Sequence, residues 1–254
     1  MGEHSKIEWT ESTWNPVTGC NKVSAGCKNC YAEAWAEMWR GKPGPYQQGF
    51  DLKMWPERLD LPKKWRAPRW VFVNSMSDLW HERVPDEFID QVMATIAGTP
   101  HHYQTLTKRA KRMRQWARGK KLPANLWLGV TVENEETYER LEELAQVEHH
   151  QKWVSHEPLI GRIAHKPGVE NVVDWVVVGG ETGHGARRMM PEWEREIRQW
   201  CEAHNKPYFM KQWGEYNAVG LKVGRKAAGK IVEGRRWNQM PELVVRQGTL
   251  AGIQ

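Results

Sequence analysis

Residues 14–32 read WNPVTGCNKVSAGCKNCYA and hold three of the four cysteines of this 254-residue chain. The three thiols, Cys20, Cys27 and Cys30, are spaced Cys-x6-Cys-x2-Cys, whereas Cys201 is far away in the sequence. Thiolates this close together usually bind iron or zinc. A structural zinc site uses four protein ligands, and no fourth cysteine lies nearby. The spacing therefore indicates a four-iron (4Fe-4S) cluster that three thiolates hold, with one iron left open.

A zinc site is the alternative for the same three cysteines. It would need a histidine as its fourth ligand, and the candidates are His4, His81 or a more distant histidine. Cys201 stands beside Trp200 in a helical stretch, so we expect it to pack as a small buried apolar side chain.

Composition limits the class of protein. A chain of this length can bury one substantial core. No apolar run approaches the ~20 residues that cross a bilayer, and residues 1–6 have no apolar stretch behind their charges, so they are not a secretory signal. Few, clustered cysteines indicate a reducing cytoplasm. The net charge of +6 favours an anionic partner.

Apolar runs alternate with helical stretches along the chain. Such alternation predicts right-handed βαβ units and a parallel sheet. We expect an α/β fold, a partial or near-closed parallel barrel of six to seven units over residues 1–216. Residues 217–254 read as a basic peripheral extension that forms a hairpin or is partly disordered. The expected strands are 7–10, 70–73, 103–107, 126–132, 152–155, 174–178 and 207–213, and the expected helices are 31–40, 85–97, 135–147 and 191–204.

Polar side chains follow most of these strands at the point where each strand ends. In a parallel barrel these ends meet at one edge, where active sites form. The sequence therefore predicts a polar pocket at that edge, with His156 and His184 beside it as acid or base candidates. The basic run at residues 108–114 reads either as a solvated helix face or as a phosphate contact. The residues of the predicted edge are Ser75, Asp78, Thr107, Glu133, Glu157, Glu181 and Gln212.

The block Asn15-Pro16-x-Thr18-Gly19-Cys20 with Cys27-x-x-Cys30-Tyr31-Ala32 resembles the cluster loop of radical S-adenosylmethionine (SAM) proteins related to spore photoproduct lyase. That family spaces its cysteines Cys-x3-Cys-x2-Cys. The longer first gap here resembles a phage-associated, radical-SAM-like family with a three-cysteine motif. The resemblance reaches residue 214 and implies a 4Fe-4S cluster, SAM on its open iron, an electron donor, and a 5′-deoxyadenosyl radical that abstracts hydrogen from a substrate.

The resemblance also implies where SAM would bind. Asn74 and Ser75 occupy the strand end at which the family holds the methionine amino group. Gly179 and Gly180 lie at the sixth strand, where the family contacts adenine through backbone. Our ribose candidates are Thr131 and Glu133, because a carboxylate or hydroxyl can bond the two ribose hydroxyls. Glu157 could reach either part of SAM, and Asp78 is a further cofactor-binding candidate at the same edge.

Three classes of function follow. The first is a radical SAM enzyme that acts on a nucleic acid or nucleotide, which the basic charge favours. The second is a radical SAM enzyme that acts on a small metabolite or peptide. The third is a zinc-bound nucleic-acid-binding protein without catalysis.

Overall fold

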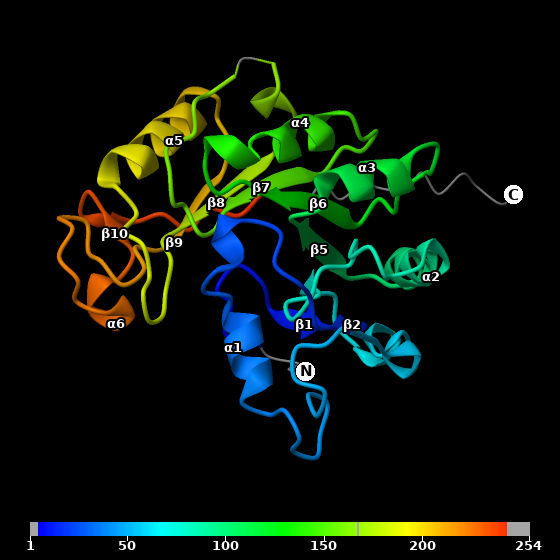
Figure 1. The fold of residues 1–254 in the computed structure, drawn as a ribbon. Coiled ribbons are helices and arrows are strands. Elements are labelled where there is room, and N and C mark those ends of the chain that lie inside the picture. The colour runs from blue at the N-terminus through cyan, green and yellow to red at the C-terminus, as the bar shows by residue number, and fades with distance from the viewer. Residues whose placement is uncertain (1–4, 167, 243–254) are drawn as a thin grey trace, which may run out of the picture.

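The computed structural model describes residues 5–166 and 168–242, and a seven-stranded parallel sheet dominates this part of the chain (Figure 1). The strands lie in the spatial order β1-β4-β5-β6-β7-β8-β9, so each strand pairs with the next one along the chain. Because the order never reverses, the sheet curls as a half-barrel, and the predicted α/β fold class is confirmed. The strands are β1 Ser12–Trp14, β4 Trp70–Val73, β5 His102–Thr107, β6 Leu126–Thr131, β7 Lys152–His156, β8 Trp175–Gly179 and β9 Tyr208–Gln212.

Four helices pack against one face of the sheet and build the main core. In α2, for example, Ile89, Val92 and Ile96 recur at helical spacing and are fully buried. The strands contribute side chains such as Val130, which is also fully buried. The helices of this face are α2 Asp86–Ala97, α3 Ala110–Ala117, α4 Glu139–Ala145 and α5 Pro191–Ala203. Cys201 of α5 lies in this core, as predicted.

The opposite face of the sheet is filled by aromatic rings. Trp9 is buried there, and its ring centroid lies 4.7 Å from Phe72, 5.2 Å from Trp153 and 6.0 Å from Trp175. The prediction of a first strand over residues 7–10 is wrong, because the first strand is β1 and the residues before it cross the sheet face. The large ring of Trp9 instead packs at the centre of this aromatic cluster and covers this face of the sheet.

Shorter elements complete the description. Helix α1, Tyr31–Glu37, ends before the predicted residue 40, and the predicted helix over 135–147 begins with a 3-10 turn, Glu135–Thr137, before α4. Two small antiparallel pairs occur, β2 Val17–Thr18 with β3 Lys53–Met54, and β10 Ile231–Val232 with β11 Arg235–Arg236. The remaining short helices are α6 Arg225–Ala228 and the 3-10 turns Ala25–Cys27, Pro56–Arg58, Pro62–Lys64 and Glu170–Val172.

The predicted extension from residue 217 includes the β10–β11 hairpin, while residues 243–254 of it lie outside the described residues. Its residues 237–239 run along the edge of the sheet. The Met210 N–H donates to the Trp237 carbonyl at 2.8 Å, and the Trp237 side chain is buried against the core. This part of the extension therefore contributes to the fold. None of the helices in the described ranges has the length and apolar character needed to cross a bilayer.

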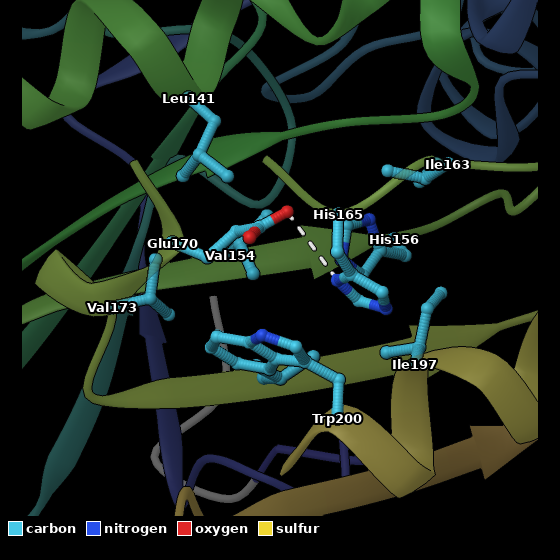
Figure 2. Close-up of a pocket in the computed structure, with 10 residues that line it drawn as sticks. Leu141, Val154, His156, Ile163, His165, Glu170, Val173, Ile197 and Trp200 are labelled. Atoms are coloured by element: carbon cyan, nitrogen blue, oxygen red, sulfur yellow. Dashed lines mark ion pairs between the residues drawn. The ribbon is translucent and has the colours of Figure 1, made fainter. Parts of the chain in front are cut away.

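His156 lies behind the sheet rather than at the predicted pocket. Its ring occupies a small cavity between α4, α5 and the sheet, beside Leu141, Ile197 and Trp200 (Figure 2). The ring Nδ1 donates to the Val132 carbonyl at 2.8 Å. The prediction of His156 as an acid or base at the polar edge is therefore wrong, because its side chain leaves β7 on the helix face.

Removing the Trp9 ring should lower the free energy of unfolding by about 3–5 kcal/mol in Trp9→Ala, because its aromatic neighbours cannot close the cavity. Urea unfolding followed by circular dichroism measures the change. Val219→Ala, at a side chain that is 74% exposed, is the control and should stay within about 0.5 kcal/mol of the wild type. A loss below about 1 kcal/mol in Trp9→Ala would show that the ring does not close this face.

The burial of His156 in this cavity makes the free energy of unfolding depend on pH. Burial lowers the pKa of His156 from 6.5 to about 4. The native state then binds fewer protons than the unfolded chain, so stability is present above about pH 6.5 and falls as the pH drops toward about 4. His156→Asn keeps a donor for the Val132 carbonyl but cannot titrate. Urea midpoints at about pH 7 and about pH 5 should therefore differ less in the variant than in the wild type, and equal differences would contradict this origin of the slope.

Candidate functional site

The cysteine loop, residues 19–31, begins at the carboxyl edge of the sheet because hydrogen bonds join the residues before it to the end of β4. The Asn15 Oδ1 atom accepts from the Ser75 hydroxyl at 3.2 Å and from the Met76 N–H at 3.0 Å. The Ser77 hydroxyl donates to the Val17 carbonyl at 2.8 Å. These contacts place Cys20 directly above the strand ends.

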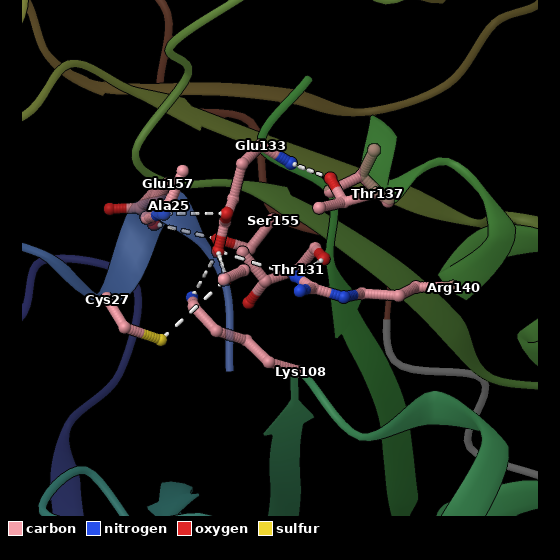
Figure 3. Close-up of polar contacts among 12 residues, drawn as sticks. Ala25, Cys27, Lys108, Thr131, Glu133, Thr137, Arg140, Ser155 and Glu157 are labelled. Atoms are coloured by element: carbon pink, nitrogen blue, oxygen red, sulfur yellow. Dashed lines mark hydrogen bonds and ion pairs between the residues drawn. The ribbon is translucent and has the colours of Figure 1, made fainter. Parts of the chain in front are cut away.

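A buried carboxylate holds the middle of the loop (Figure 3). Glu133, at the end of β6, is fully buried and accepts from the Ser24 hydroxyl and the Gly26 N–H, both at 2.8 Å. The Lys108 Nζ atom lies 3.3 Å from the carboxylate and the Arg140 Nη1 atom 3.4 Å from it. A Cβ on residue 26 would lie 2.2 Å from the Glu133 Cδ atom, so only glycine allows this approach.

The charge of Glu133 is balanced within the protein. Burial by itself raises the pKa of this carboxyl, but Lys108, Arg140 and the two donors of the loop outweigh that effect and leave the pKa below its ordinary value. Glu133 is therefore ionised at neutral pH and draws the loop onto the sheet.

A second anchor is Arg109, which follows β5 and is almost fully buried. Its guanidinium donates to the Cys20 Sγ atom at 3.4 Å and to the Asn21 Oδ1 atom at 2.6 Å. Asp78 and Glu82 hold the guanidinium in place, at 3.3 Å and 2.9 Å. Asp78 is itself fixed to β5, because the Thr107 hydroxyl donates to it at 2.7 Å.

The far end of the loop touches two more strand ends. The Tyr31 hydroxyl donates to the Ser75 carbonyl at 2.6 Å, after β4. Arg187, after β8, donates to the Ala25 carbonyl at 2.8 Å while it pairs with Glu181. The loop therefore spans the carboxyl edge from β4 across β5 and β6 to β8.

All three cysteines of the loop are free and partly buried. Burial, reinforced by Asp78, raises the pKa of Cys20 to about 11, and burial also raises the pKa of Cys30. Arg109 and Lys108 oppose these shifts, on Cys20 and Cys30 respectively. Metal binding must then release protons from the thiols, and the adjacent cations favour the resulting thiolates.

The donor set of the loop is three free thiols with Arg109 and Lys108 beside them. Within the described ranges, no three His, Cys, Asp or Glu side chains, the three loop cysteines included, surround a common ion position. His81 is occupied otherwise, because its Nδ1 atom accepts from the Arg83 N–H at 3.1 Å. His4 lies outside the described residues. A cluster that carries negative charge suits three thiols with Arg109 and Lys108 beside them.

The predicted cofactor-binding residues fall into two groups. Asn74, Ser75, Asp78 and Glu133 support the cysteine loop through the contacts above or, for Asn74, through its Oδ1 atom, which accepts from the Val17 N–H at 3.3 Å. The Asn74 Nδ2 atom is buried without a hydrogen-bond partner among the described residues. Whether these residues also bind a cofactor stays a prediction.

The second group lies along the edge over β6 to β9. Glu157 accepts from the Ser155 hydroxyl at 3.3 Å and pairs with Lys211 at 2.5 Å. A Cβ on Gly179 would lie 3.2 Å from the Glu157 Oε2 atom, and one on Gly180 would lie 2.0 Å from the Trp213 carbonyl oxygen. Thr131 is buried beside Glu133 (Figure 3).

Sequence reasoning named the basic run but did not predict that cations of this site pair with its acids. Lys108, Arg109, Arg140 and Lys211 all pair with acids at the edge. The signal in the sequence was the position of these residues, because Lys108 and Arg109 directly follow β5 and Lys211 is the penultimate residue of β9. The first two residues of the basic run, Lys108 and Arg109, therefore pair with acids of the edge and do not form a solvated helix face.

The fold and this edge define the class of protein: an α/β half-barrel that carries a three-cysteine loop across its carboxyl edge. The chain belongs to the family described as "Protein of unknown function (DUF5131)", whose sequence profile matches residues 4–241. No curated protein sequence matches the chain. The predicted phage-associated family stays a prediction.

Among solved structures, the chain is similar to a cysteine-to-serine mutant of spore photoproduct lyase, with 13% sequence identity and a TM-score of 0.43. The similarity covers 77% of this chain and 62% of the other. The chain therefore spans less than two thirds of the length of that neighbour.

Replacing Glu133 by glutamine should loosen the loop, because Lys108 and Arg140 lose their buried countercharge. We expect a loss of about 3 kcal/mol in the free energy of unfolding and faster alkylation of the loop cysteines by iodoacetamide. Glu139→Gln, at an exposed position of α4, is the matched control and should change neither. Unchanged alkylation in Glu133→Gln would contradict the anchoring role.

Proposed function

We propose that the chain is a radical SAM enzyme in which Cys20, Cys27 and Cys30 ligate a 4Fe-4S cluster, and that it acts on a nucleic acid or nucleotide. The observation that carries the proposal is the position of three free thiols in one loop, anchored over the carboxyl edge of a parallel half-barrel. When bound, such a cluster supplies an electron to SAM, whose cleavage yields the radical that abstracts hydrogen.

The residues around the thiols have defined tasks in this proposal. Arg109 donates an N–H to the Cys20 sulfur, and hydrogen bonds to cluster sulfurs tune the reduction potential. Glu133 and Asp78 act as positioning residues, because their carboxylates are already used to hold the loop and Arg109.

The groups left for SAM lie on the strand ends beside the loop. The unpartnered Asn74 Nδ2 atom supports a role in holding an oxygen of the ligand, such as the methionine carboxylate. Glu157 is partly exposed and can accept from ribose hydroxyls or an amino group. The candidates for SAM are thus Asn74, Ser75, Thr131, Glu157, Gly179 and Gly180.

The proposed substrate class, a nucleic acid or nucleotide, is based on the net charge of the chain. The chain carries a net charge of +6, which favours a polyanion. A small metabolite or peptide substrate is the competing reading, and retention on nucleic acid that weakens with salt would separate the two. A cytoplasmic electron donor would reduce the cluster.

Anaerobic reconstitution with iron and sulfide tests the proposal. We expect about four iron atoms per chain in the wild type, and formation of 5′-deoxyadenosine after addition of dithionite and SAM. Cys27→Ala should lose both. Cys201→Ala, which removes the cysteine of α5, should keep both and is the matched control.

Two results would overturn the assignment. One is a wild-type chain that binds a single zinc ion and no iron. The other is a Cys27→Ala chain that assembles the same cluster as the wild type.

A further inference from the structure

Helix α1 carries an exposed aromatic stripe that no part of the described chain covers. Tyr31, Trp35, Met38 and Trp39 are 58%, 42%, 60% and 44% exposed. Their spacing places them on one side of the helix and of the turn that continues it. Ala32 and Ala36 face inward and are buried. Large apolar side chains gathered on one exposed face usually mark a binding surface.

The stripe begins at the candidate cluster site. Tyr31 follows Cys30 directly, and α1 leads away from the sheet edge into solvent (Figure 1). From Tyr31 to Trp39 the helix rises about 12 Å. An extended ligand that lies along this face of α1 would therefore reach from solvent to the three thiols, and part of it would contact the exposed aromatic rings.

The rings are held in place by one another. The centroids of Trp35 and Trp39 lie 5.9 Å apart, and Trp35 meets Tyr46 edge to face at 4.6 Å. Lys42 lies over the Trp39 ring, 5.4 Å from its centroid. Ordered rings beside a cation lose little conformational freedom when a flat ligand stacks on them.

The charges of residues 20–53 favour an anion. Each acid of this segment is neutralised, since Glu33 pairs with Lys22, and Glu37 and Asp51 pair with Arg40. Three cations of the segment have no ion-pair partner in the described part of the chain. They are Lys28, Lys42 and Lys53.

We infer that this face of α1 binds a single-stranded nucleic acid, with bases stacked on Trp35 and Trp39 and a phosphate near Lys42, which lies over the Trp39 ring. Aromatic platforms beside unpaired cations are how proteins bind single strands, because every base offers a flat face and every phosphate a charge. A duplex fits poorly, since its bases are already stacked. The inference deepens the proposed function and rests on it for the identity of the substrate, but strand binding itself needs no cluster.

Fluorescence anisotropy with labelled single-stranded DNA and RNA of roughly 12 nucleotides tests the inference on the full chain. Trp39→Ala should raise Kd at least about fivefold, whereas Trp39→Phe, which keeps a ring, should stay within about twofold of the wild type. Lys42→Glu should also weaken binding and reduce its salt dependence. Lys226→Glu, at an exposed lysine of α6, makes the same charge change elsewhere and is the control.

Several outcomes would overturn the inference. These are no binding of either strand, equal binding by Trp39→Ala and the wild type, or an equal loss in Lys226→Glu and Lys42→Glu. Self-association of the wild type that Trp39→Ala abolishes would assign the face to a second copy of the chain instead. The binding assay does not use the cluster, so its result is independent of the reconstitution experiment. A chain that binds single strands but assembles no cluster would contradict the proposed function and still support the inferred binding surface.

Discussion

The buried carboxylate of Glu133 fixes the cysteine loop on the sheet, and the geometry of the whole edge depends on it. Burying an ionised carboxylate away from water costs several kcal/mol of free energy unless nearby charges and hydrogen-bond donors compensate it. Lys108 and Arg140 supply the charges from the sheet side, and Ser24 and Gly26 supply donors from the loop. The loop therefore cannot lift away without leaving a buried charge partly unsatisfied, and its thiols are held where the strands end.

The long gap between the first two cysteines provides these contacts. Asn21 binds Arg109, and Ser24 and Gly26 bind Glu133, and all three residues lie between Cys20 and Cys27. A gap of three residues, as in the radical SAM proteins that the motif resembles, would be too short to include both anchors in this way. The extra residues thus give the loop a second point of attachment, over β6, in addition to the one over β5.

Most of the strands from β4 to β9 could be predicted because they contain a short apolar run followed at once by polar residues, although β5 is itself largely polar. Trp9 could not be placed, since an aromatic residue in a short apolar run looks the same in a strand and in a plug across the sheet. His156 is the last residue of β7, yet its side chain points to the helix face, and the sequence of so short a strand does not show to which face each side chain points. Glu133 was recognised as an edge residue, but its partner Gly26 is 107 positions away in the sequence. No local pattern reports a contact of that separation, nor one between Arg109 and Asn21.

The edge and α1 are parts of one surface, because the helix starts at the last cysteine. In the proposed enzyme, the strand ends would hold the cofactor and the helix would guide the substrate. The most direct test of the central claim is Mössbauer spectroscopy of the chain reconstituted with isotopically enriched iron, with and without SAM. Ligation by Cys20, Cys27 and Cys30 predicts one iron site that differs from the other three and shifts when SAM is added. Four equivalent sites that do not respond to SAM would contradict it.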